Sequence, residues 1–193
     1  MKKILLLLAE GFEMYEASAF IDVIGWNLKE GDQSTRLYSC ALKKQIRSAF
    51  DQKFIVDFSL DEIDADEYSA LAIPGGFEEY NFYGDAYSTQ FSDLICQFNR
   101  QGKLIASICT GAFPLAKSGV LSGKSATTYN LNPIRQKNLS TYGVKVVNQP
   151  LIVTDNIVTS WNPATAMDVA FLLLEKLTSS ENAQRLRHLM GFV

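Results

Sequence analysis

The sequence is poor in the residues that most often bind metal ions. It has one histidine, His188, and three cysteines, Cys40, Cys96 and Cys109, in a chain of 193 residues. These cysteines lie too far apart for the spacing typical of a zinc site. An odd number of cysteines without an export signal also predicts free thiols rather than disulfides. We therefore predict neither a metal ion nor another cofactor.

An excess of charge and a long hydrophobic run are missing as well. The formal net charge is -3, which provides no basic surface for binding nucleic acid. The apolar run at residues 4–8 follows two lysines, but it is too short for a signal peptide and no small-residue cleavage pattern follows it. No other run approaches the roughly 20 residues that span a bilayer. The sequence predicts a cytoplasmic protein that binds no membrane.

Short apolar runs alternate with amphipathic segments along the whole chain. Hydrophobic residues make up 47% of it, enough for a sizeable core, and the length suits one domain better than two. We predict strands at 3–9, 35–40, 68–73, 104–108, 125–128, 144–147, 151–154 and 157–160, and helices at 16–29, 85–100, 112–118, 133–139, 163–177 and 180–190. Residues 45–48 and 54–56 are either separate short strands or a hairpin. Such alternation predicts a parallel sheet with helices on both faces. The predicted fold is one α/β domain over residues 1–193, of the doubly wound or flavodoxin-like kind.

Polar or glycine-containing clusters follow four of the predicted strands. In chain order they are Glu10, Gly11, Glu13 and Glu16, then Gly75 and Gly76, then Cys109, Thr110 and Gly111, and last Tyr129 and Asn130. Ligands of a parallel sheet bind outside the carboxyl ends of its strands. We therefore expect these clusters to face one crevice.

The residues around Cys109 favour a reactive thiol. Ser107 and Gly111 are small, as the flanking positions of a nucleophile elbow must be. A cysteine at the start of a helix is expected to have a lowered pKa, because the helix dipole favours the thiolate. The sequence predicts a catalytic Cys109 on this ground. The alternative is a small hydrophobic residue buried in the core.

Three further positions would support such a thiol. The backbone N–H groups of Gly75, Gly76 and Thr110 could form an oxyanion hole. Glu16, if buried and protonated, could donate a hydrogen bond to the thiolate or carry a proton. The alternatives are that the glycines form a simple turn and that Glu16 only stabilises the start of a helix.

Two other features have more than one interpretation. Four aromatic residues follow the glycine pair and could line a pocket or form a dimer surface; they are Tyr80, Phe82, Tyr83 and Tyr87. Five acidic residues lie between positions 61 and 67, and we predict that they form a solvated face.

The chain resembles the ThiJ/PfpI superfamily, which shares the class I glutamine-amidotransferase-like fold. The matching stretches are residues 8–13 with Glu16, 72–76, 105–111, 119–129, and 159–160 with 163–164, in the order of the family. The resemblance implies a flavodoxin-like three-layer sandwich with a mostly parallel sheet, and a homodimer. It also implies that Cys109 is the elbow nucleophile and that Glu16 is its acidic partner. Known members of the superfamily include oxidative-stress proteins, glyoxalases and deglycases, peptidases and isonitrile hydratases.

The sequence departs from this family at Tyr129, where many members have histidine. A Cys–His pair would require His188 to reach the crevice, for example from a partner subunit. The missing base weakens the peptidase interpretation most, because that reaction must activate the thiol and protonate a leaving amine. We predict a cysteine-dependent enzyme for a small electrophile such as a carbonyl compound, with Tyr129 and Gly111 in its pocket. The alternatives are an oxidative-stress sensor that acts through Cys109, or an isonitrile-hydratase-like or amidase-like hydrolase.

Overall fold

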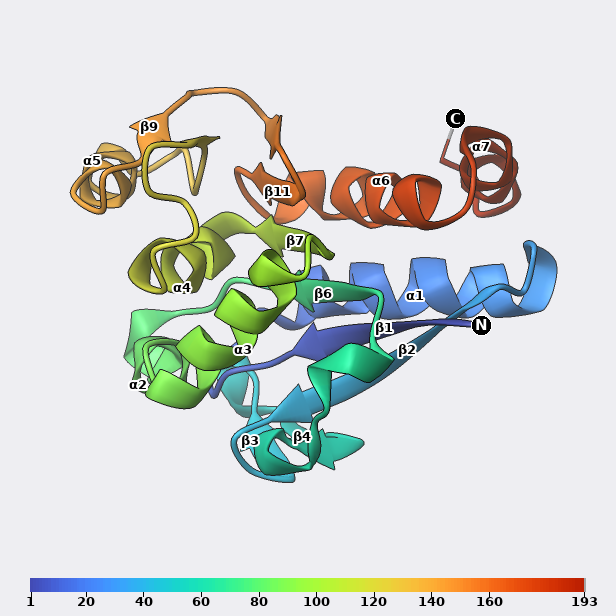
Figure 1. Ribbon diagram of the computed structural model, residues 1–193, viewed down its shortest axis with the longest axis horizontal. Coiled ribbons are helices and arrows are strands. Elements are labelled where there is room, and N and C mark those ends of the chain that lie inside the picture. Colours follow the sequence, from blue (N-terminus) through green and yellow to red (C-terminus); the bar gives the residue numbers. More distant parts are fainter. Residues whose placement is uncertain (193) are drawn as a thin grey trace.

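A seven-stranded sheet forms the centre of the computed structural model, which describes residues 1–192 (Figure 1). Its strand order is β10-β11-β7-β6-β1-β2-β5, and all neighbours are parallel except β10 and β11. The strands are β1 (Lys2–Leu7), β2 (Thr35–Ala41), β5 (Phe58–Ser59), β6 (Ala70–Ile73), β7 (Leu104–Ile108), β10 (Leu151–Thr154) and β11 (Ile157–Ser160). The predicted mostly parallel α/β sheet is thereby confirmed.

Helices cover both faces of this sheet. One face carries α1 (Met14–Glu30), α6 (Ala166–Leu177) and α7 (Ser180–Leu189), and the other carries α2 (Phe82–Ala86), α3 (Thr89–Arg100) and α4 (Ala112–Lys117). The remaining helix, α5 (Pro133–Ser140), lies beside α4. This three-layer arrangement is the predicted flavodoxin-like sandwich.

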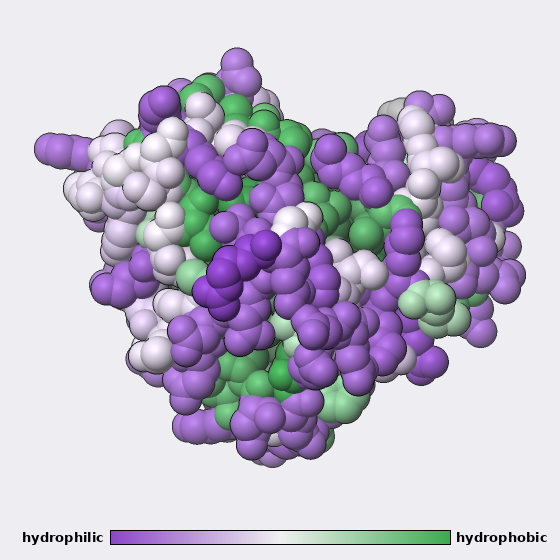
Figure 2. Space-filling model, viewed as in Figure 1, coloured by the Kyte–Doolittle hydropathy of each residue, from purple (hydrophilic) through white to green (hydrophobic). Residues whose placement is uncertain are grey.

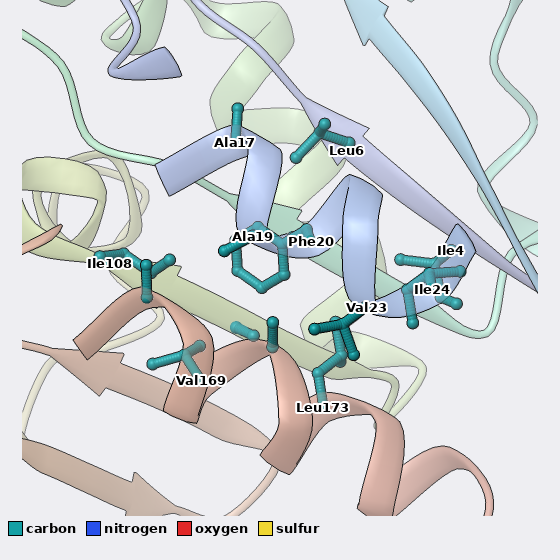
Figure 3. Close-up of a cluster of buried hydrophobic side chains, with 14 of the residues drawn as sticks. Ile4, Leu6, Ala17, Ala19, Phe20, Val23, Ile24, Ile108, Val169 and Leu173 are labelled. Carbon is teal, nitrogen blue, oxygen red and sulfur yellow. The ribbon is translucent and has the colours of Figure 1, made fainter. Parts of the chain in front are cut away.

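The two faces of β1 show why the sheet is buried on both sides. Ile4 and Leu6 belong to the core under α1 and α6, whereas Leu5 and Leu7 belong to the core under α3 and α4. Successive side chains of a strand point to opposite faces, so a continuous apolar run supplies both cores. Figure 3 shows the first core, where Phe20 of α1 lies between the sheet and α6.

Two predicted helices have a different form in the structure. The helix expected at 85–100 is two helices, because Ser88 accepts a hydrogen bond from the Phe91 N–H and begins α3 anew. The helix expected from residue 163 begins with a 3₁₀ turn, Pro163–Thr165, before α6. Neither difference moves a candidate site residue.

Small strands complete the architecture. β3 (Gln45–Arg47) and β4 (Lys53–Ile55) form a hairpin, which is one of the two expected forms, while β8 (Ser125–Ala126) and β9 (Lys145–Val146) pair outside the main sheet. The edge strand β5 was not predicted, because two half-buried residues carry no periodic signal.

The surface at the acidic segment matches the sequence-based expectation. All five acidic residues between positions 61 and 67 are exposed, as predicted. Figure 2 shows a mainly hydrophilic face on which hydrophobic residues gather in separate patches. Within residues 1–192, no helix has the length and apolar character needed to cross a membrane.

Candidate functional site

Cys109 occupies a sharp turn between β7 and α4. Its φ of 55° lies in the left-handed region, which a non-glycine residue adopts only at a cost. The Thr128 hydroxyl donates a 2.8 Å hydrogen bond to the carbonyl oxygen of Cys109 and holds the turn. A Cβ at Gly111 would lie 2.7 Å from the Ile73 carbonyl oxygen, so the turn packs directly on β6. This is the strained, closely packed geometry of a nucleophile elbow.

Glu16 is fully buried in the first turn of α1. Its Oε2 accepts a 2.6 Å hydrogen bond from the Gly75 N–H, whereas its Oε1 is buried with no partner among the described residues. Burial raises the pKa of this carboxyl to about 8, with Glu13 adding to the shift and the Gly75 hydrogen bond opposing it. Glu16 is therefore protonated at neutral pH and has a proton to donate beside the Cys109 thiol.

The thiol does not gain the low pKa that its position before a helix predicted. Burial raises the pKa of Cys109, and the neighbouring Glu16 raises it further, while the Thr110 backbone N–H lowers it. The physical reason is that α4 has only six residues, so its dipole is weak, whereas the burial of Cys109 at the base of the turn disfavours a charged sulfur. A charged carboxyl would oppose the thiolate, whereas the protonated carboxyl can stabilise it by a hydrogen bond. The two groups therefore act as one coupled pair.

The glycine pair uses its N–H groups within the protein. Gly75 donates to Glu16, and Gly76 donates a 2.8 Å hydrogen bond to the Thr110 hydroxyl, which in turn donates to the Gly76 carbonyl oxygen at 2.9 Å. Neither N–H is free for a substrate oxygen in this arrangement. The structure instead gives the glycines a positioning role, since they hold the carboxyl and the elbow in place.

A cavity of about 310 Å³ opens onto the thiol. It is lined by Glu13, Glu16, Gly76, Phe77, Glu79, Cys109, Thr110, Tyr129, Asn132, Arg135 and Pro163. Its size is at the lower end for ligand sites and suits a small molecule. The cavity is therefore lined by residues from all four clusters that the sequence analysis expected at one edge of the sheet.

The predicted site residues divide into two groups. Cys109, Glu16, Gly76, Thr110 and Tyr129 line the cavity, whereas Gly75 and Gly111 lie behind it against Thr110 and β6. Four lining residues were not predicted from the sequence, namely Phe77, Glu79, Asn132 and Arg135. The only signal for them was their position just after Gly76 and Tyr129.

His188 does not lie at this site within the chain. It is exposed on α7, which packs on the C-terminal end of α1 through a hydrogen bond between Asn182 and Asn27. Glu16 lies at the opposite end of α1, a helix roughly 25 Å long. Figure 1 shows α7 at this far end of the molecule. A Cys–His pair within one chain is excluded by this separation.

The four aromatic residues after the glycine pair mostly pack among themselves. Phe82 is buried, and the ring of Tyr83 packs against those of Phe82, Tyr87 and Phe113. None of the four lines the cavity, although Tyr83 contacts Arg135, which does. The aromatic residues that line the cavity are Phe77 and Tyr129.

The three cysteines should differ strongly in reactivity. Cys40 is fully buried in β2 and burial raises its pKa, whereas Cys109 faces the cavity. We expect iodoacetamide to modify Cys109 at least about 100-fold faster than Cys40 in the native protein. Mass spectrometry of the peptides gives both rates, and a denatured sample serves as the control in which the two converge. Equal rates in the native protein would contradict the buried position of Cys40.

Comparisons with known proteins establish the family of this chain. The DJ-1/PfpI family model matches residues 2–176. Protein dj-1beta of Drosophila melanogaster is 31% identical over 185 residues, which cover 95% of this chain and 93% of that protein. Protein DJ-1alpha of the same organism is 30% identical and covers 98% and 83% of the two chains. A crystal structure of Drosophila melanogaster DJ-1beta aligns with a TM-score of 0.86 at 27% identity, covering 100% of this chain and 98% of that one. The chain therefore belongs to the DJ-1/PfpI family.

Proposed function

We propose that this protein is a cysteine-dependent enzyme that acts on a small electrophilic carbonyl compound. The observation that carries the proposal is the pairing of Cys109 with a buried, protonated Glu16 beside a cavity of about 310 Å³. A thiol is an intrinsically strong nucleophile, and a carbonyl compound needs a proton at its oxygen when the thiol adds. The pair supplies both groups in one place.

The first step is addition of the thiol to the carbonyl carbon. The Cys109 sulfur forms a bond to carbon, the π electrons move to the carbonyl oxygen, and Glu16 donates its proton to that oxygen. Glu16 then takes up the proton released from the thiol, so the hemithioacetal forms with no net change in protons. The Thr110 N–H, which points toward the Cys109 sulfur, stabilises negative charge there.

A 2-oxoaldehyde can react further without a cofactor. Glu16 first releases its proton to water, which its pKa of about 8 allows, and the resulting carboxylate removes the proton from the carbon bonded to sulfur and returns it to the neighbouring carbon. The hydroxyl proton of the hemithioacetal moves to the oxygen on that neighbouring carbon. The product is a thioester, which water hydrolyses to a 2-hydroxy acid and the free thiol. The aldehyde carbon is oxidised and the neighbouring carbonyl carbon is reduced, so no external oxidant is needed.

The residues at the cavity support this chemistry better than peptide hydrolysis. Peptide hydrolysis needs a base that activates the thiol and then protonates an amine. Tyr129 is the residue at the position where histidine was expected, and His188 lies at the other end of α1. Addition to an aldehyde releases no amine and needs only the thiol and the carboxyl.

Incubation with methylglyoxal tests the proposal, with lactate measured as the product. We expect turnover by the native protein, none by Cys109→Ala, and at least about a tenfold loss in Glu16→Gln, because the proton carrier is removed. Cys96→Ser is the matched control, since Cys96 lies in α3 away from the cavity. Peroxide-driven oxidation of Cys109 without turnover of any 2-oxoaldehyde would overturn the proposal and support a redox sensor.

A further inference from the structure

Arg135 is the only basic residue that lines the Cys109 cavity within the described residues. It lies on α5, two residues after Pro133 begins that helix. Its Nη1 donates a 3.2 Å hydrogen bond to the Tyr83 hydroxyl, and its Nη2 donates a 3.3 Å hydrogen bond to Glu78 Oε2. The guanidinium also stacks over the Tyr83 ring at 5.7 Å. These contacts fix the orientation of the guanidinium at the cavity wall.

Tyr83 holds this guanidinium from the side of the protein interior. Burial raises the pKa of Tyr83 to about 12, a charge on Cys109 raises it further, and Arg135 lowers it. The phenol is therefore neutral at physiological pH and accepts the hydrogen bond from Arg135. An arginine held in this way loses little conformational freedom when it binds a ligand.

The ion pair between Arg135 and Glu78 is weak enough for another carboxylate to replace Glu78. The Glu78 side chain is 67% exposed, whereas that of Arg135 is 25% exposed. An ion pair with such an exposed partner contributes little, because water competes for the carboxylate. The guanidinium has five N–H donors, of which these contacts use two. A carboxylate that enters the cavity can therefore replace Glu78 or bind beside it.

The other ionisable residues that line the cavity are all acidic, so Arg135 is the group there that can attract an anion. Glu16 is protonated at neutral pH. The Glu13 carboxylate accepts a hydrogen bond from the Tyr15 N–H at the start of α1, and Glu79 is exposed to solvent. Repulsion from Glu79 is therefore screened by water, while the partly buried guanidinium lies where its charge is screened least.

We propose that Arg135 binds a carboxylate of the substrate, so that the preferred substrates are small carbonyl compounds that carry a carboxylate. This assignment rests on the proposed function, because it assumes that Cys109 attacks the carbonyl carbon. Arginine suits the role, since its planar N–H groups match the two oxygens of a carboxylate. A cavity of about 310 Å³ holds the two ends of one small molecule against Arg135 and Cys109.

Two alkylating reagents test the assignment without any turnover. Iodoacetate and iodoacetamide have nearly the same shape, and both form a bond from the Cys109 sulfur to carbon as iodide leaves, but only iodoacetate carries a carboxylate. The measured quantity is the ratio of their rate constants at Cys109, followed by mass spectrometry. This ratio cancels any general change in the reactivity of the thiol.

We expect Arg135→Gln to lower the iodoacetate-to-iodoacetamide ratio about tenfold, and Arg135→Lys to lower it less, because lysine keeps the charge but loses the planar geometry. Glu78→Gln should raise the ratio more than Glu79→Gln, which removes the same charge from a residue not bonded to Arg135. Arg100→Gln, an exposed change at the end of α3, is the control and should leave the ratio unchanged.

The outcomes separate this inference from the proposed function. An unchanged ratio in Arg135→Gln, or equal effects of Glu78→Gln and Glu79→Gln, would overturn the carboxylate site. A lowered ratio in a protein that turns over no carbonyl compound would retain the carboxylate site and refute the carbonyl chemistry. If Arg135→Gln fails to fold, the Glu78 and Glu79 variants still decide the question.

Discussion

Replacing Glu16 with glutamine should stabilise the protein at neutral pH, and the gain should grow as the pH rises. Glutamine has the same shape as a protonated glutamic acid and can keep the hydrogen bond from the Gly75 N–H. It cannot ionise when the protein unfolds. The native protein lacks this advantage, because its unfolded state releases the Glu16 proton to water.

The sign follows from the two pKa values of the carboxyl. In the unfolded chain the pKa of Glu16 is about 4.3, and in the folded protein burial raises it to about 8. Between these values the folded state holds a proton that the unfolded state has lost, so the free energy of unfolding falls as the pH rises. The slope of about 1.4 kcal/mol per pH unit gives a loss of about 3 kcal/mol between pH 5 and pH 7. Below about pH 4 both states are protonated and the effect disappears.

Urea denaturation of both proteins at pH 4, 5, 6, 7 and 8 measures this difference. Near pH 4 we expect the native protein and Glu16→Gln to have similar free energies of unfolding. From pH 5 to pH 7 the advantage of Glu16→Gln over the native protein should grow by about 3 kcal/mol, which corresponds to about 6–12 °C in Tm. Glu30→Gln at the exposed end of α1 is the control, and its difference should stay constant. A pH-independent difference for Glu16→Gln would show that the folded carboxyl titrates normally.

Replacing Gly75 with alanine should destabilise the protein by about 2–4 kcal/mol and disturb the reactive pair. The new Cβ would lie 2.7 Å from the Thr110 hydroxyl oxygen, 2.9 Å from the Thr110 backbone nitrogen and 3.0 Å from Glu16 Oε2. All three distances are too short for a carbon atom. Neither neighbour can move freely, because Thr110 belongs to the elbow and Glu16 is fully buried. The Gly75 peptide must therefore shift and weaken its hydrogen bond to Glu16.

Gly25→Ala is the matched control for this prediction. Gly25 lies on the exposed side of α1, where a Cβ would have no neighbour within 4 Å. Alanine there should stabilise the helix by about 1 kcal/mol. Urea denaturation gives both free energies, and iodoacetamide rates at Cys109 report on the pair in Gly75→Ala. Unchanged stability and an unchanged alkylation rate in Gly75→Ala would mean that the three segments are not packed as described.

Local patterns in the sequence were sufficient to predict most of the helices and strands. The strand at 104–108 and those at 151–154 and 157–160 agree with β7, β10 and β11 at both ends. Each is a short apolar run bounded by turn residues, so its limits are set locally. The helix expected at 85–100 was wrong in its continuity, because the break at Ser88 interrupts a pattern that is apolar on both sides.

The sequence placed Glu16, Gly76, Cys109 and Tyr129 near one edge of a parallel sheet, because each lies on a segment that follows a predicted strand, and all four line one cavity. The strand expected before Tyr129 is shorter than predicted, since β8 ends at Ala126 and pairs outside the main sheet. The roles of these groups at the cavity depend on how the chain packs in three dimensions. That packing buried Glu16 and so raised its pKa, it directed the Gly75 and Gly76 N–H groups to partners inside the protein, and it brought Arg135 of α5 to the cavity. The physical reason is that strand ends follow from local hydrophobic periodicity, whereas burial, hydrogen-bond partners and charge environment depend on segments that are distant in sequence.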